Sequence, residues 1–205
     1  ANARAIRHGF PWVYANELVT DRRTRGLAPG TLAQLEDAER KPMGLVAVNP
    51  NSKIIARMLD QDPEAQIDQS WFEGHFARAL ALRSQLFDAP YYRLIHAEDD
   101  GLPGVIIDRF GDPCVIQPNA AWVEALLAPM VAALQSVTGV AHVLKNASGR
   151  TRQLHGLDVT TEVLPGQAIQ RRLQVPINSA TTRAHTESRT QPAQYTGTER
   201  EHRHS

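Results

Sequence analysis

The segment from Arg93 to Gln117 constrains the fold of this chain more than any other part of the sequence. Two apolar β-branched runs, Val105 to Ile107 and Cys114 to Ile116, flank Phe110-Gly-Asp-Pro113, whose glycine and aspartate suit a tight reversal. Just ahead, Asp100-Gly-Leu-Pro-Gly104 places two glycines where a residue with a β-carbon would follow the backbone less easily. The segment therefore predicts a β-hairpin preceded by a glycine-rich turn.

The residues before this hairpin change their period near residue 66. Alternating or apolar runs at Thr31 to Glu36, Met43 to Val48 and Lys53 to Leu59 predict three short strands in a small barrel or sheet. From Asp68 to Phe87 the apolar residues recur every three or four positions, which predicts an amphipathic helix of about five turns. Asp68 or Ser70 is the expected N-cap.

A second helix is predicted from about Asn119 to Leu134, and Pro129 is expected to kink or divide it. Tyr91 to His96 and Ala141 to Lys145 indicate further strands. The order helix, strands, helix, strand predicts an α+β unit over residues 67–165. Residues 166–205 are polar and lack a sustained period, so we expect an irregular tail.

Composition excludes several classes of protein. No apolar run is long enough to cross a bilayer, and the N-terminus lacks the pattern of a secretory signal. The single cysteine, Cys114, rules out an internal disulfide framework and a multi-cysteine metal site. We expect a soluble, cytoplasmic protein with no membrane partner.

Charge is unevenly distributed although the formal net charge is zero. Basic residues outnumber acidic ones in residues 1–60, whereas acidic residues dominate residues 61–118. Only part of the chain is therefore expected to face a polyanion.

Four stretches carry a resemblance to a known family. Residues Arg93-Leu-Ile-His-Ala-Glu-Asp-Asp-Gly-Leu-Pro-Gly-Val-Ile-Ile-Asp-Arg-Phe-Gly111 closely resemble the central-domain signature of bacterial class I SAM-dependent 23S rRNA 5-methylcytosine methyltransferases. Arg7-His-Gly-Phe-Pro-Trp-Val-Tyr-Ala-Asn16 resembles the entry of that family's N-terminal PUA domain, and Val48-Asn-Pro-Asn-Ser-Lys-Ile-Ile-Ala-Arg57 resembles its last-strand motif. Val175-Pro-Ile-Asn-Ser-Ala-Thr181 resembles the approach to the catalytic domain, after which the family pattern fades.

The resemblance implies an organisation and a function. It implies a PUA-like small β-barrel over residues 1–66, a linking α+β domain over 67–165 and a diverged tail over 166–205, with the Rossmann-like catalytic domain absent. The chain would then be the RNA-binding, substrate-positioning portion of a transferase of rRNA processing. S-adenosyl-L-methionine is implied for a full-length member, and no cofactor is expected in this chain.

The catalytic groups of cytosine C5 methylation are not expected here. A SAM fold needs a glycine-rich loop after its first strand, yet the glycines beyond residue 150 are isolated. The reaction also needs an activated thiolate, and Cys114 lies in an apolar run without a neighbouring cation, which indicates a core residue. We expect no catalytic residue, and whether the chain counts as an enzyme stays open.

Two other groups could look catalytic or metal-binding. Asp99, Asp100, Asp108 and Asp112 surround the glycine-rich turns, where turn formation and capping are the favoured roles. His185, His202 and His204 lack thiol or carboxylate ligands in register, so no metal site is expected.

An RNA surface is the favoured functional prediction. Phe10, Trp12 and Tyr14 could form a base-stacking platform, although a core role is favoured in a chain with few aromatic residues. Basic residues near the N-terminus are expected to contact the phosphates of structured RNA, with ribosomal RNA as the implied partner. They are Arg4, Arg7, Arg22, Arg23, Arg25, Lys53 and Arg57. The alternatives are a free-standing, non-catalytic PUA-type RNA-binding protein and a protein-interaction or dimerisation module, and formation of a homodimer stays open.

Overall fold

A computed structural model describes residues 3–148 and 161–164. All described residues belong to one compact unit. The irregular tail predicted for 166–205 lies outside the described residues. In the described part, no helix has the length and apolar character needed to cross a membrane.

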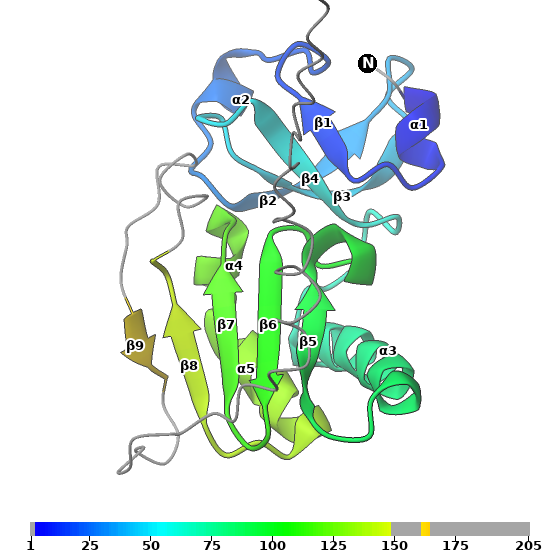
Figure 1. Cartoon of the computed structure of the whole chain (residues 1–205). Helices are drawn as coiled ribbons and strands as arrows, with labels where there is room; N and C mark the ends of the chain where they lie inside the picture. The colour runs from blue at the N-terminus through cyan, green and yellow to red at the C-terminus, as the bar shows by residue number, and fades with distance from the viewer. Residues whose placement is uncertain (1–2, 149–160, 165–205) are drawn as a thin grey trace, which may run out of the picture. The chain divides into compact units, whose positions relative to one another are not determined.

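The first sheet is antiparallel and contains four strands in the order β1-β4-β3-β2 (Figure 1). Their bounds are β1 Trp12–Tyr14, β2 Thr31–Glu36, β3 Pro42–Val48 and β4 Ile54–Asp60. Two short helices accompany it, α1 Ala3–Arg7 and α2 Arg22–Arg25. The three strands predicted between residues 31 and 59 are confirmed.

The first sheet packs around a cluster of buried apolar residues. Val13, Val46, Ile55 and Met58 are buried in one cluster, and Ile6 of α1 packs into it. β3 and β4 are buried on both faces, because their residues pack into both clusters of buried residues, and as central strands they are paired on both edges. The expected barrel differs from this arrangement, since the described pairings form a sheet with β1 and β2 as its edges.

The second sheet contains five strands in the order β5-β6-β7-β8-β9. Their bounds are β5 Tyr91–His96, β6 Val105–Phe110, β7 Cys114–Pro118, β8 Val143–Asn146 and β9 Thr161–Val163. All pairs are antiparallel except β7 with β8. The chain passes between those two parallel strands through α4 Ala121–Ala125 and α5 Leu127–Thr138.

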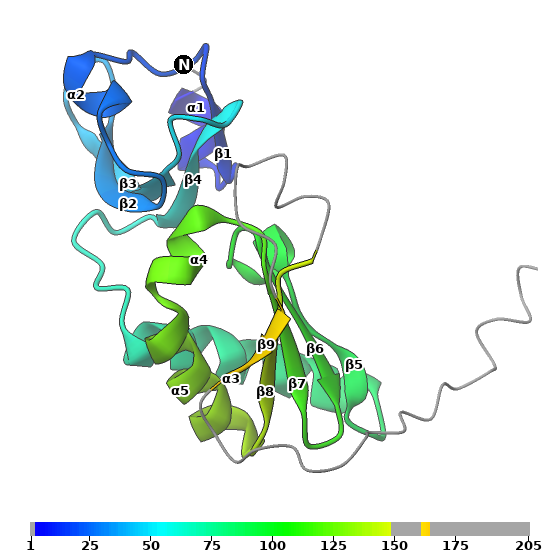
Figure 2. The same ribbon diagram turned by 90° about the vertical axis from the view of Figure 1, so that its left-hand side faces the viewer.

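Helices cover one face of this sheet, as Figure 2 shows for α3, α4 and α5. α3 spans Gln69–Leu86, and its N-cap Asp68 accepts a hydrogen bond from the Trp71 amide at 2.9 Å, as the sequence predicts. Phe72 and Phe76 of α3 are fully buried, and the Phe72 ring stacks on Trp122 of α4 at 6.2 Å between centroids. The α+β prediction is confirmed for this part of the chain.

The hairpin and its glycine-rich turn have the predicted form. Phe110 N donates to Pro113 O at 2.9 Å and closes the reversal between β6 and β7. A short 3-10 helix, η1 Ala97–Asp100, leads into the turn. Gly104 has φ +77°, and a β-carbon there would lie 2.6 Å from Ala120 Cβ. Only glycine fits this position without a shift of the backbone.

The second predicted helix is divided, but not at the proline itself. α4 ends at Ala125 and α5 begins at Leu127, so Pro129 lies in the first turn of α5. Proline is tolerated in the first turn because the amides there have no partner within the helix. In one continuous helix, the Pro129 ring would clash with the carbonyl of Ala125, four residues earlier. α5 continues beyond the predicted end and stops before Gly139, which has φ +70°.

The domain boundaries expected near residues 66 and 165 stay a prediction. Each sheet has its own cluster of buried residues, but Ala47 and Leu59 of the first sheet belong to the cluster of the second.

Candidate nucleic-acid interface

The arginines of α2 form the most concentrated basic feature of the first sheet. Asp21 caps this short helix: its carboxylate accepts from the Thr24 amide at 2.8 Å and from the Thr24 hydroxyl at 3.1 Å. The amide hydrogen bond from Thr24 is the main reason why the pKa of Asp21 lies below its usual value. Arg22, Arg23 and Arg25 are all exposed, so one helical turn presents three guanidinium groups to solvent.

Lys53 lies beside the end of β1. It is exposed and directly precedes β4, and its carbonyl accepts from the Ala15 amide at 2.9 Å. Tyr14 is the register partner of Ile54, so the Lys53 backbone adjoins the end of the edge strand. Seven residues separate the end of β1 from the start of α2.

Arg4 and Arg7 belong to a different place. Both are exposed on α1, and Figures 1 and 2 show α1 apart from α2. Arg7 also forms an ion pair with Asp37, whose pKa is lowered mainly by the hydrogen bond from the Lys41 amide. The structure thus divides the five predicted arginines before residue 26 between two helices, and Lys53 and Arg57 lie on neither.

Arg57 does not face solvent as the sequence analysis expected. Its exposed fraction is 7%, because β4 is flanked by β1 and β3. Burial lowers the pKa of Arg57, and the charge of Glu98 opposes that shift. Its register partner Trp12 donates from Nε1 to Glu98 Oε1 at 2.8 Å. A direct phosphate contact from Arg57 does not fit this environment.

The favoured core role is wrong for two of the three N-terminal aromatic residues. Phe10 is 41% exposed and Tyr14 is 37% exposed, whereas Trp12 is half-buried. Val13 takes the core position of β1. Since successive side chains of a strand point to opposite faces, Trp12 and Tyr14 point away from the core that Val13 fills.

The sequence analysis missed one exposed apolar side chain near α2. Val19 is 94% exposed in the loop between β1 and α2. No periodic pattern marks it, and the only available signal is a β-branched apolar residue set between polar residues and the arginine run.

The four aspartates near the glycine-rich turn have structural partners. Asp100 binds Arg83, Asp108 binds Arg93, Asp112 binds His142 and Asp99 lies 3.0 Å from His96. Asp112 also accepts a hydrogen bond from the Ala141 amide at 2.8 Å. This bond links the turn between β6 and β7 to the residues just before β8. Asp100, Asp108 and Asp112 thus join neighbouring segments through ion pairs, and the turn and capping roles expected for the four aspartates stay a prediction.

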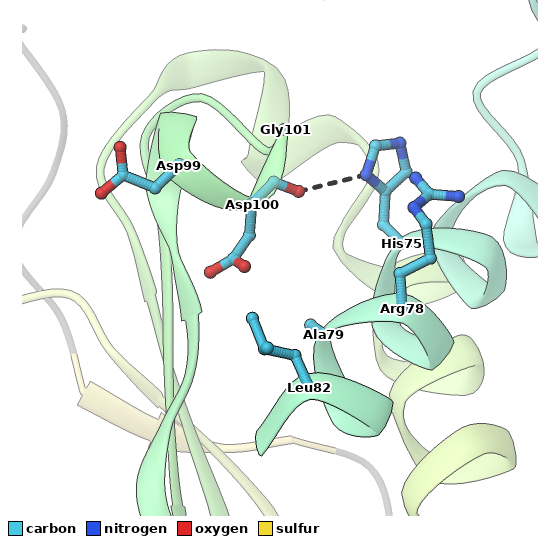
Figure 3. A pocket seen from close by; sticks show the side chains of 7 residues that line it. All are labelled: His75, Arg78, Ala79, Leu82, Asp99, Asp100 and Gly101. Atoms are coloured by element: carbon cyan, nitrogen blue, oxygen red, sulfur yellow. Dashed lines mark hydrogen bonds between the residues drawn. The ribbon is translucent and has the colours of Figure 1, made fainter. Parts of the chain in front are cut away.

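A cleft of about 330 Å³ lies between α3 and the glycine-rich turn, and Figure 3 shows its lining. His75 Nδ1 lies 3.2 Å from the Asp100 carbonyl, and burial is the main cause of its lowered pKa. Asp99 points away from His75 and Arg78 in this view. The cleft therefore does not bring an acid and a base together in the way that general acid-base catalysis requires.

The only cysteine is unsuited to nucleophilic attack. Cys114 is fully buried in β7, and desolvation raises the pKa of its thiol to about 12. The thiol form therefore dominates near neutral pH, and a reactive thiolate is not available.

The glycine-rich turn does not have the arrangement of a nucleotide-binding loop. Gly101 and Gly104 precede a strand, instead of joining a strand to a helix as a nucleotide-binding loop does. A β-carbon at Gly101 would lie 3.0 Å from His75, and one at Gly104 would meet Ala120, so the protein itself occupies both places. Among the described residues, no cluster of three or more metal ligands was found, and His185, His202 and His204 lie outside them.

Comparison with known proteins identifies a family model for the N-terminal residues and relatives that align with most of the chain. Residues 1–61 match a family model described as a PUA-like domain. The chain is 33% identical over 167 residues to "Ribosomal RNA large subunit methyltransferase I" of Alteromonas mediterranea, and 33% identical over 169 residues to the protein of that name from Erwinia tasmaniensis. Each alignment covers 80% of this chain and 42% of the relative, so the chain spans less than half the length of these relatives.

Solved structures support the fold. A putative SAM-dependent methyltransferase from Streptococcus mutans superimposes with a TM-score of 0.67 at 16% identity, over 82% of this chain and 42% of that one. A putative methyltransferase complexed with SAH gives a TM-score of 0.64, also at 16% identity. The chain thus carries a PUA-like domain within a mixed α+β structure, and it is homologous to proteins named as large-subunit rRNA methyltransferases.

Proposed function

We propose that this chain is the RNA-binding, substrate-positioning portion of a SAM-dependent rRNA methyltransferase. The observation that carries the proposal is the exposed arginine turn, Arg22, Arg23 and Arg25 on α2, which lies within the part of the chain that matches the PUA-like domain. The relatives named as rRNA methyltransferases support ribosomal RNA as the partner.

The arginine turn suits the RNA backbone. Three neighbouring cations repel one another, and phosphates placed between them would relieve that repulsion and accept hydrogen bonds from the guanidinium groups. Asp21 fixes the helix by capping it, but its carboxylate is engaged by Thr24. Lys53 extends the same basic surface toward β1. Backbone contacts of this kind fix where the RNA lies without reading its sequence.

The proposed reaction of the whole protein is methyl transfer from SAM to C5 of a cytosine in 23S rRNA. That reaction needs a thiolate that adds to C6 and a pocket for an extruded base. Among the described residues the only cysteine does not supply this thiolate, because Cys114 is buried and its pKa is raised to about 12. We therefore assign to these residues the binding and orientation of RNA, and we derive no chemical step from them.

The dependence of RNA affinity on salt tests this proposal. Each neutralised phosphate is expected to add about 0.7 to the slope of log K against log salt on a single strand, and about 0.9 is the value for a B-form DNA duplex. Replacing Arg22, Arg23 and Arg25 by Ala should therefore flatten the slope by up to about three units, with little change in sequence preference. Affinity is measured by fluorescence anisotropy with a structured rRNA fragment over a series of salt concentrations.

The control removes exposed charge elsewhere. Lys41 and Arg78 are exposed and lie outside the arginine turn, so a Lys41→Ala/Arg78→Ala variant should leave most of the slope intact. An unchanged slope in the triple variant, with its fold confirmed by circular dichroism, would remove the arginine turn from the interface. If the unaltered chain binds no RNA at low salt, the proposed function itself is wrong.

A further inference from the structure

Three aromatic residues follow the edge of the first sheet at two-residue spacing. Trp12 and Tyr14 belong to β1, and Phe10 precedes it. β1 has a neighbour only on the β4 side within the described sheet. Trp12 and Tyr14 alternate with the buried Val13 along β1, and the Phe10 ring lies 6.1 Å from the ring of Trp12. We call Phe10, Trp12 and Tyr14 the aromatic row.

We propose that the aromatic row stacks unpaired bases, so that this surface prefers looped or single-stranded RNA to an uninterrupted duplex. The proposal deepens the proposed function, since it rests on RNA binding by the same part of the chain and adds which RNA is preferred. Aromatic rings accept any base on their faces, so such a site selects unpaired structure without selecting sequence.

The spacing of the rings favours unpaired bases. The centroids of Phe10 and Trp12 are 6.1 Å apart with planes inclined at 76°. Neighbouring bases stacked in a duplex are parallel and about 3.4 Å apart. Bases that rest on neighbouring rings are therefore no longer stacked on each other, which a continuous duplex does not allow.

Exposure and rigidity support the same assignment. Phe10 and Tyr14 are the exposed members of the row, while the half-buried Trp12 is fixed by its hydrogen bond to Glu98. The buried Arg57 lies opposite Trp12 in the sheet, and its positive charge interacts with the negative charge of Glu98. The repulsion between Glu98 and the phosphates of a bound RNA is thereby reduced. A ring fixed before binding loses little conformational entropy when a base stacks on it.

Charge identifies the occupant as RNA. Lys53 adjoins Tyr14. The loop after Tyr14 contains the exposed Val19 and leads to the arginine turn. At the other end of the row, Arg4 is exposed on the helix that precedes Phe10. Exposed rings with basic residues toward both ends combine stacking with phosphate contacts, as in single-strand-binding surfaces. A partner protein with an apolar patch would not require these cations.

The test compares two RNAs and two double variants. Phe10→Leu/Tyr14→Leu keeps apolar side chains but removes two aromatic faces. Phe87→Leu/Tyr91→Leu is the matched control. Phe87 follows α3 and Tyr91 begins β5, and their exposed fractions are 48% and 49%. Binding is measured at one salt concentration with a mixed-sequence single-stranded RNA and with a fully paired duplex of the same length.

The expected result is selective. The row variant should lose about tenfold in affinity for single-stranded RNA for each stack removed, equivalent to about 1.4 kcal/mol each. Its affinity for the duplex and its salt slope should stay close to those of the unaltered chain. The control variant should bind both RNAs normally, and Tyr14→Phe, which keeps the ring, should also retain affinity.

The contrary outcomes separate the two proposals. If the row variant binds single-stranded RNA as tightly as the unaltered chain, or loses affinity equally for both RNAs, stacking by the row is refuted. RNA binding through the arginine turn would still stand if the Arg22, Arg23 and Arg25 variant flattens the salt slope. If neither RNA binds to the unaltered chain, the failure belongs to the proposed function.

Discussion

Asp100 holds the glycine-rich turn against α3, and its removal should be costly. Its carboxylate accepts from Arg83 Nη1 at 2.8 Å, from Arg83 Nη2 at 2.6 Å and from the His96 amide at 2.7 Å. Both side chains of the ion pair are largely buried, with 13% of Arg83 and 11% of Asp100 exposed. Bidentate, charge-assisted geometry in a largely buried place predicts a strong ion pair.

Asp100→Ala should destabilise the fold by about 3 kcal/mol. Breaking a buried pair by removing one partner costs about 3 to 5 kcal/mol, because the remaining charge is left desolvated. We take the lower end since Arg83 retains some exposure and still donates from Nε to the Arg93 carbonyl. Adding Arg83→Met should restore part of the loss, and the double-mutant cycle should give a coupling of about 2 kcal/mol.

Urea denaturation followed by tryptophan fluorescence measures these changes. With a slope of about 1 to 3 kcal/mol per molar urea, the midpoint of Asp100→Ala should fall by about 1 M or more. Asp99→Ala is the matched control, because its side chain is 78% exposed and its loss should change stability by less than about 0.5 kcal/mol. A loss below about 1 kcal/mol for Asp100→Ala, or a coupling near zero, would refute this account of the turn.

Two further predictions follow from buried or hydrogen-bonded titratable groups. Cys114 should resist a thiol reagent in the native chain and react once urea unfolds it, because burial raises its pKa to about 12; prompt reaction of the folded chain would contradict the burial. The pKa of Asp112 is lowered first by the Ala141 amide and then by His142, so its stabilising effect is present above the unfolded value of about 3.9 and is lost as pH falls through the lower folded value. Asp112→Asn should therefore destabilise the chain near pH 6 more than near pH 2, and an equal loss at both values would argue against this linkage.

Local signals were sufficient to predict the longer elements. α3 has a capping residue at Asp68 and buried positions at three- and four-residue spacing, and both signals lie within the helix itself. The β6 and β7 hairpin likewise depends on adjacent runs and on the reversal at Gly111. Neither required knowledge of distant contacts.

The short N-terminal elements could not be predicted in the same way. α1, β1 and α2 contain five, three and four residues, which is less than one full window of helical or strand periodicity. The sequence consequently placed Arg4 and Arg7 with Arg22, Arg23 and Arg25 in one basic group, whereas the structure carries them on different helices.

Pairing between strands decides which of the candidate side chains can meet RNA. Lys53 and Arg57 lie four residues apart, and no local pattern distinguishes them, yet β4 is a central strand and buries Arg57 opposite Trp12. β1 is an edge strand, so Phe10 and Tyr14 keep exposed rings that the scarcity of aromatic residues had assigned to the core. The structure thus buries one predicted phosphate contact and leaves the rings of Phe10 and Tyr14 partly exposed. For this reason the edge of the first sheet, together with the arginine turn, is where substitutions should affect RNA binding without unfolding the chain.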